Sequence, residues 1–193
     1  MVDKTMTIPN LKHRFNEDVV PQVREQFSLK NTNQLPQLSK VVLNCGVGRF
    51  LENQKLKPEI RDTVIATLTT ITGQKPIMVL AKQSVANFKV REGAPSAFMV
   101  TLRGDRMWHF IDRLMNLAMP RIKDFRGVKT TAFDQAGNFS LGLTEQAVWP
   151  EINMARVNFT HGMNINICFE QSNIEMSRFI LTELGMPFAK KES

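Results

Sequence analysis

Basic side chains and structure-breaking residues gather in one stretch of the chain, between two apolar runs. Lys82, Lys89 and Arg91 lie there with a single acid among them, and Gly93 and Pro95 follow. Cationic side chains in such excess attract the phosphate backbone of a nucleic acid. A long polar connection between two strands of a compact domain is usually functional or disordered. The stretch therefore predicts a basic loop that projects from a sheet and binds a polyanion.

Neutral polar side chains form a second group that could bind RNA. Asn44 interrupts an apolar run, Gln74 follows a glycine, and Thr101 lies within the motif VTLRG. Ordinary polarity at strand edges and helix ends explains these positions equally well. If the fold brings them to one sheet face, they offer uncharged donors and acceptors for RNA bases and sugars, with nearby Lys and Arg for phosphates.

The chain contains no recognisable catalytic or metal-binding pattern. His13, His109 and His161 are isolated, without a carboxylate or thiol at metal-ligand spacing. Cys45 and Cys168 lie far apart in apolar runs, which is typical of reduced thiols in a core. A Walker loop and a nucleophile elbow are both absent from the sequence. We therefore expect no enzymatic activity, no catalytic residues, no cofactor and no metal.

A glycine turn leaves one alternative open, a small-molecule or nucleotide-binding α+β protein. Gly46 and Gly48 follow a predicted strand and begin a G-x-G pattern. However, the third glycine position holds Leu51, and the next predicted helix begins too late to point its amides at a pyrophosphate. Nucleotide affinity of the purified protein would favour this alternative, and co-purifying RNA would count against it.

Charge is distributed unevenly along the 193 residues. The chain has 25 Lys and Arg against 18 Asp and Glu, a formal net charge of +7. Residues 75–106 contain six basic and two acidic side chains, and residues 121–129 contain four and one, whereas residues 130–193 contain four and seven. Because a surface without a partner more often mixes its signs, this local excess indicates a face for a polyanion.

Hydrophobic periodicity predicts helices and strands without strict alternation. The predicted helices are 11–27, interrupted at Pro21, then 57–72, 106–119 with Asp105 as its cap, and 174–184. The predicted strands are 39–47, 77–80, 97–102, 139–143 and 164–169, and the rest of 121–146 is an extended loop. This pattern indicates an α+β fold, an antiparallel or mixed sheet with helices on one face.

Length and composition indicate one domain over residues 1–193, with flexible ends at about 1–8 and 188–193. Apolar residues make up 42% of the chain and charged residues 22%, close to ordinary globular values. No run approaches the ~20 apolar residues that a bilayer-spanning helix needs, and the N-terminus lacks the apolar core of a signal peptide. We therefore expect a cytoplasmic protein without a membrane partner.

Several motifs together resemble a known ribosomal protein family. They are LNCGVG (43–48), TGQKP (72–76), KQSVANFK (82–89), VTLRGDRMW (100–108) and PRIKDFRG (120–127), followed by GNFSLG and EQAVWPEI. In this order they are similar to the bacterial large-subunit ribosomal protein that binds 5S ribosomal RNA, fifth in the large-subunit numbering. The similarity covers about residues 10–188. Any one of these motifs alone would be only modestly specific.

The resemblance implies a structural constituent of the large ribosomal subunit that works in translation and is not an enzyme. Members of the family have a curved sheet, attach 5S rRNA in the central protuberance among other large-subunit components, and touch the P-site tRNA through a projecting loop. They also form an intersubunit bridge with the thirteenth small-subunit ribosomal protein.

By the same resemblance, individual residues acquire expected roles. The 5S rRNA contacts correspond to Asn44, Gln74 and Thr101. The tRNA-contacting loop, residues 83–95 with the preceding lysine, corresponds to Lys82, Gln83, Ser84, Lys89, Arg91 and Gly93. The bridge region, residues 123–139, corresponds to Lys123, Arg126, Lys129 and Asp134. The chain departs from the family pattern at Asn87, where glycine is common, at the loop tip (Ala94 and Ser96), and in its longer ends.

Overall fold

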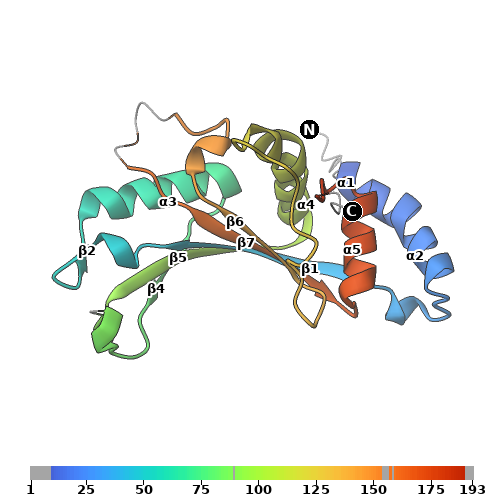
Figure 1. Ribbon diagram of the computed structural model, residues 1–193, viewed down its shortest axis with the longest axis horizontal. Helices are drawn as coiled ribbons and strands as arrows, with labels where there is room; N and C mark the ends of the chain where they lie inside the picture. Colours follow the sequence, from blue (N-terminus) through green and yellow to red (C-terminus); the bar gives the residue numbers. More distant parts are fainter. Residues whose placement is uncertain (1–9, 89, 154–156, 158, 190–193) are drawn as a thin grey trace, which may run out of the picture. The chain divides into compact units, whose positions relative to one another are not determined.

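A five-stranded sheet forms the centre of the computed structural model, which describes residues 10–88, 90–153, 157 and 159–189 (Figure 1). In spatial order its strands are β4 (Ile77–Leu80), β5 (Pro95–Leu102), β1 (Gln37–Gly46), β7 (Met163–Glu170) and β6 (Phe139–Leu143). A two-stranded hairpin consists of β2 (Leu51–Glu52) and β3 (Lys55–Leu56). The predicted α+β class is confirmed.

Neighbouring strands of the sheet run antiparallel. β5 pairs in this way with both β1 and β4. Beside β1, the Ser39 hydroxyl donates to the Glu170 carboxylate at 2.6 Å, and Cys45 Sγ lies 3.2 Å from His161 Nδ1. Residue numbers therefore rise along β1 as they fall along β7. At the other side of β7, the Phe169 N–H donates to the side chain of Asn138, just before β6.

Side chains of β1 alternate between a covered and an open face of the sheet. Val41, Leu43 and Cys45 are completely buried, whereas Val42 and Asn44 are half-buried. This alternation follows from the period of two along a strand. Because antiparallel partners point to the same side, the register also assigns the side chains of β5 to the two faces.

One compact unit contains residues 41–102 and 140–166. Its helix α3 (Pro58–Thr72) packs against β5 and buries Val64, Leu68 and Ile71. Pro58 suits the first turn because its missing N–H is not needed there, and Gly73 ends the helix with a φ of +67°. The sequence predicts this helix at 57–72, so its existence and type are confirmed.

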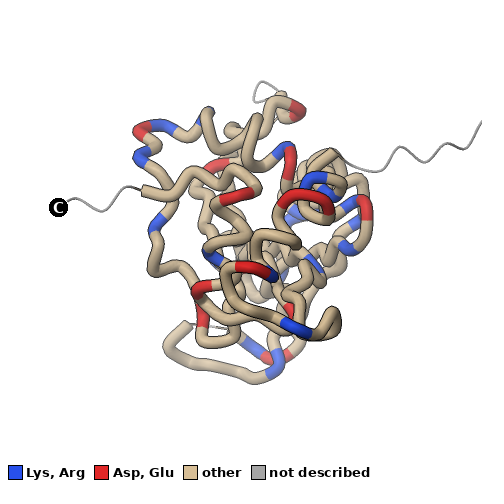
Figure 2. The backbone as a smooth tube through the Cα atoms, turned by 90° about the vertical axis from the view of Figure 1, so that its right-hand side faces the viewer, with Lys and Arg blue, Asp and Glu red and all other residues tan. Residues whose placement is uncertain are grey.

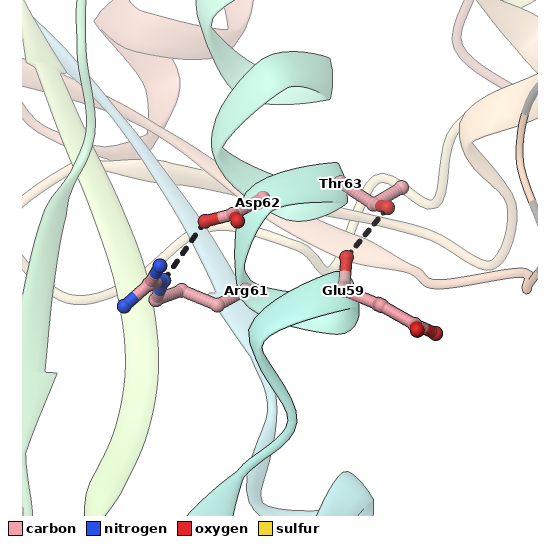
Figure 3. Close-up of polar contacts among 4 residues, drawn as sticks. All are labelled: Glu59, Arg61, Asp62 and Thr63. Carbon is pink, nitrogen blue, oxygen red and sulfur yellow. Dashed lines mark hydrogen bonds and ion pairs between the residues drawn. The ribbon is translucent and has the colours of Figure 1, made fainter.

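Two local polar contacts lie in the first turns of α3, as Figure 3 shows. The hydroxyl of Thr63 donates to the Glu59 carbonyl at 2.7 Å, and Arg61 Nε lies 2.8 Å from the Asp62 carboxylate (Figure 3). Arg61 is therefore paired within its own helix.

The other compact unit contains residues 1–40, 103–139 and 167–193, of which the described part is helical apart from strand ends and loops. Its helices are α1 (Asn10–Arg14), α2 (Val20–Gln26), α4 (Gly104–Arg113) and α5 (Ile174–Glu183). Aromatic pairs connect them. The rings of Phe15 and Trp108 are 5.1 Å apart, and those of Phe27 and Phe179 are 6.1 Å apart.

A π-helical turn precedes a proline in two places of this unit. Residues Phe15–Val19 form one π turn before Pro21, and Leu114–Ala118 form another before Pro120. The predicted interruption at Pro21 therefore takes the form of a wide turn within a continuous helical run. Apolar residues at every fourth position drift by about 40° per step around an α-helix. A wider turn offsets this drift, so the residues at every fourth position stay buried along one stripe, namely Leu11, Phe15, Val19 and Val23.

Short 3₁₀ turns connect the remaining elements, namely Thr32–Gln34, Gly48–Phe50, Ala86–Phe88, Met119–Arg121 and Gln146–Val148. Within the described ranges, the structure has no helix of the length and apolar character that a bilayer crossing requires.

Two local predictions are wrong. Asp105 does not cap α4, because the N-cap is Arg103 and the Asp105 carboxylate lies 2.9 Å from Lys12 Nζ instead. Cys168 is only half-buried, because it occupies the open-face register of β7, whereas Cys45 is buried as predicted.

Candidate nucleic-acid interface

The structure brings together the three neutral polar residues that the sequence singled out. In the β1–β5 register, Val42 faces Thr101 and Asn44 faces Met99, so Asn44 and Thr101 are diagonal neighbours on the open face. Gln74 lies at the edge of this face, where its Nε2 donates to the Thr101 carbonyl at 3.4 Å. The hydroxyl of Thr72, in turn, accepts the Gln74 backbone N–H.

Two further amides lie on the same face, and sequence reasoning missed them. Along β7, Met163, Ile165 and Ile167 are buried, whereas Asn164 is exposed and Asn166 half-buried. The alternation in NINICF is the signal that would have identified them, because it separates the two faces of a strand.

Within residues 41–102 and 140–166, the open face of the sheet is uncharged. Its side chains are those of Val42, Asn44, Ile77, Val79, Ala97, Met99, Thr101, Ser140, Asn164 and Asn166, together with Gly46 and Gly142. Lys40 precedes Val42 in the same register of β1 and is half-buried, so a basic side chain borders this set of residues along the strand. This set of residues is called the amide face below.

The predicted basic loop is a regular extension of the β4–β5 hairpin. Backbone hydrogen bonds join Ala81 to Gly93 and Ala94, at 3.0 and 2.8 Å. Further out, Val85 and Val90 exchange a pair of bonds around the Ala86–Phe88 turn. The ladder gives the hairpin its own framework. β5 begins at Pro95, so the predicted loop end already belongs to the strand.

Side chains also hold the hairpin in place. Gln54, from the β2–β3 turn, accepts the Arg91 backbone N–H at 2.9 Å, and the Ser84 hydroxyl accepts the Glu92 N–H at 2.9 Å. Gly93 has a φ of +79°, a conformation that favours glycine. The site residue Ser84 therefore has a structural role in this hairpin.

Cations of the hairpin point to solvent. Lys82, Gln83 and Arg91 are exposed, and neither Lys82 nor Arg91 forms an ion pair with another described residue. Lys89, which the sequence places in the same group, lies outside the described residues. The sequence reasoning overlooked Phe88, a large apolar side chain that is 78% exposed at this turn.

The predicted bridge segment combines an exposed basic side with a packed apolar side. Lys123, Arg126 and Lys129 are all exposed. Beneath them, Val128 pairs with Phe188 and is buried, so the stretch is not the purely irregular surface loop that we expected. Figure 2 shows basic and acidic positions interspersed along the chain.

Asp134, the acid of the predicted bridge, is engaged in a turn. Its carboxylate accepts the backbone N–H of Asn138 at 2.7 Å and the side-chain amide of Asn138 at 2.8 Å. These bonds, the side-chain bond first, lower the pKa of Asp134. Phe133 and Phe139 flank the turn, with ring centroids 5.2 Å apart. Two residues of the predicted flexible C-terminal end are packed: the Phe188 ring lies against Phe133, and the Ala189 backbone N–H donates to the Val128 carbonyl. The rest of that predicted end, residues 190–193, lies outside the described residues.

The glycine turn after β1 lacks the geometry of a phosphate-binding loop. Gly48 begins a short 3₁₀ turn, and the helix that follows begins only at Pro58, after the β2–β3 hairpin. Arg49 lies over the Phe50 ring at 4.6 Å and donates to the Thr160 carbonyl. The nucleotide-binding alternative therefore receives no support from this region.

A buried thiol–imidazole pair lies on the covered side of the sheet. Cys45 Sγ is 3.2 Å from His161 Nδ1, and the His161 backbone N–H donates to Gln146 Oε1. Burial raises the pKa of Cys45 to about 11, and burial also lowers the pKa of His161. Both groups are therefore neutral at pH 7. Across the described part of the chain, no three metal-ligating side chains cluster.

An open sheet with an uncharged polar face, beside a basic hairpin, defines a binding protein. Comparison with known proteins specifies which one. Residues 31–91 match the family model described as Ribosomal protein L5, and residues 95–188 match the model that describes the C-terminus of the same ribosomal family.

Alignments with individual proteins cover almost the whole length of both this chain and the relative. Large ribosomal subunit protein uL5 of Microcystis aeruginosa is 46% identical over 178 residues, 92% of this chain and 97% of the relative. The protein of that name from Streptomyces coelicolor is 46% identical over 185 residues, 95% and 97% of the two chains. The chain belongs to the ribosomal protein L5 family and is a structural constituent of the large ribosomal subunit, not an enzyme.

Proposed function

We propose that this protein binds 5S rRNA through the amide face and holds it in the central protuberance of the large subunit, in the cytoplasm. The observation that carries the proposal is the convergence of Asn44, Gln74 and Thr101 at one side of the β1–β5 pair. Amide and hydroxyl groups contact RNA bases and sugars, whereas phosphate contacts mainly position a complex. Membership of a ribosomal family makes RNA the ligand that these groups would meet.

Filter binding of 5S rRNA to the Asn44→Ala, Gln74→Ala, Thr101→Ala triple variant tests the proposal. Each lost hydrogen-bond partner should cost roughly 1 to 3 kcal/mol. This corresponds to about 5- to 150-fold in affinity per position. Asn33→Ala is a suitable control, because Asn33 is an exposed amide in a different unit.

The thermal transition should be measured beside the affinity. Gln74 also donates to the Thr101 carbonyl, so the triple variant loses one internal bond. Asn44→Ala alone removes a side chain without a hydrogen-bond partner among the described residues, and so keeps the test valid if the triple variant is less stable. Binding at full strength by a folded triple variant would reject this site.

The basic hairpin supports a second contact, with the P-site tRNA. Lys82 and Arg91 are exposed without ion pairs among the described residues, and the backbone ladder holds the hairpin as a defined extension of the sheet. Cations presented in this way suit phosphates, which carry no sequence information. We therefore propose that the hairpin, including Gln83, Lys89 and Gly93, contacts the body of any P-site tRNA.

The segment 123–139 supports a third contact, the intersubunit bridge with the thirteenth small-subunit protein. Its Lys123, Arg126 and Lys129 are exposed, and the backbone between them is held by the pairing of buried Val128 with Phe188. A rigid support lowers the entropic cost of binding. Because the Asp134 carboxylate already binds Asn138, we assign the bridge contact to the three cations, with Asp134 shaping the turn.

A further inference from the structure

The strand β7 contributes two amide side chains to the amide face, and neither has a role assigned so far. Asn164 and Asn166 point to the amide face, while the residues between and beside them are buried. Neither these two side chains nor that of Asn44 makes a hydrogen bond to another described residue. β7 lies between β1 and β6, so the amides continue the surface beyond the β1–β5 pair.

Because the amide face has no charged side chain, it suits the ribose and base edges of a nucleic acid better than the phosphates. Phosphates are held mainly by Lys and Arg, and within residues 41–102 and 140–166 the face has neither. An amide both donates and accepts, and the ribose 2′-hydroxyl does the same. A-form RNA displays its 2′-hydroxyls and base edges in a wide, shallow minor groove, which a sheet face can approach.

Two glycines permit a close approach at the same place. A Cβ at Gly46 would meet no heavy atom within 4 Å, and one at Gly142 would lie 3.4 Å from Asn164 Oδ1. Packing with neighbouring groups does not demand glycine at either position, and neither has a positive φ. Glycine inside a strand often marks a site where a ligand comes close to the backbone.

We propose that Asn164 and Asn166 bind ribose 2′-hydroxyls and base edges in the minor groove of an RNA helix, so that the amide face distinguishes RNA from DNA without using charge. This inference rests on the proposed binding of 5S rRNA and adds two specificity residues to it. Because the contacts are uncharged, their loss weakens binding without changing its salt dependence. Removing a phosphate contact, by contrast, reduces the slope of log K against log salt by about one.

Filter binding of 5S rRNA at several salt concentrations tests the proposal. The Asn164→Ala, Asn166→Ala variant should bind at least ~10-fold more weakly than the wild type, with an unchanged salt slope. A DNA strand of the 5S sequence should fail to compete for the wild-type protein. Affinity within about twofold, a slope reduced by about one, or equal competition by the DNA would each overturn the inference.

A second variant guards against a loss of folding. Asn164→Asp with Asn166→Asp keeps the side-chain shape but removes the donors and adds negative charge, so it should bind more weakly than the alanine variant. Wild-type affinity of this variant would overturn the inference. If the wild type itself does not bind 5S rRNA, the proposed function fails. If the Asn44 variant loses affinity while the β7 variants do not, only this inference fails.

Discussion

The thiol of Cys45 should make the protein sensitive to alkaline pH. Its side chain is completely buried, and Sγ lies 3.2 Å from the neutral imidazole of His161. Burial raises the pKa of the thiol from 9.0 to about 11, and the nearby charge of Arg49 only partly opposes this shift. A thiolate at this position would lose its hydration without gaining a close cationic partner.

The sign and size of the effect follow from proton linkage. Between pH 9 and 11 the unfolded chain releases the thiol proton while the folded chain retains it. The free energy of unfolding therefore falls as the pH rises through this window, and the stabilisation is fully present below pH 9. One pKa unit corresponds to about 1.4 kcal/mol, so the shift of about two units predicts a total loss of roughly 3 kcal/mol, complete only well above pH 11.

Urea denaturation between pH 8 and pH 11 measures this loss. Lysines also titrate in this range, so the informative quantity is the difference in unfolding free energy between wild type and Cys45→Ala. That difference should shrink by about 2 kcal/mol from pH 9 to pH 11, because part of the titration lies outside this interval. Cys168→Ala, which removes a half-buried thiol, should leave most of the alkaline loss in place. A constant difference across the range would refute the argument from burial.

Three further predictions concern acid stability and the proposed contacts. Burial lowers the pKa of His161, so the unfolded chain binds a proton first, and stability should fall below about pH 6.5 by at most ~1.4 kcal/mol per pH unit. Thermal denaturation should show this fall in the wild type and not in His161→Gln. Lys82→Ala with Arg91→Ala should reduce P-site tRNA retention by assembled ribosomes while 5S affinity stays within about threefold, or ~0.6 kcal/mol; equal losses would indicate that the hairpin folds back onto 5S rRNA. Alanine at the three cations of residues 123–129 should impair subunit association in sedimentation assays and preserve 5S binding, and lost 5S binding by a folded variant would contradict the assignment.

Local signals in the sequence were sufficient for most of the helices and strands. Helix α3 could be predicted because Pro58 and Gly73 suit its two ends and a clear apolar stripe lies between them. Asp105 misled the prediction because an acid near a helix start can either cap it or bind a distant cation. Here it binds Lys12, which lies 93 residues away.

The candidate site was only partly predictable, because its residues meet through the sheet register. Asn44 and Thr101 were identified individually, but only the pairing of β1 with β5 places them on one face. Cys168 was assigned to the core because its strand was taken as a continuous apolar run, and the same error hid Asn164 and Asn166. Contact between Cys45 and a histidine 116 residues away has no signal in the spacing of either residue.

The position of β4 at the edge of the sheet has a consequence for the protein before it meets RNA. Among the described strands, β4 has a neighbour on one side only, and its Ile77, Met78 and Leu80 are 47–60% exposed. An apolar edge of this kind favours strand-to-strand aggregation of free chains. Exposed Lys75 and Lys82 lie just outside the two ends of the strand, so two aligned copies would oppose lysine to lysine in either direction. We therefore expect Lys75 and Lys82 to oppose edge-to-edge association of newly made chains.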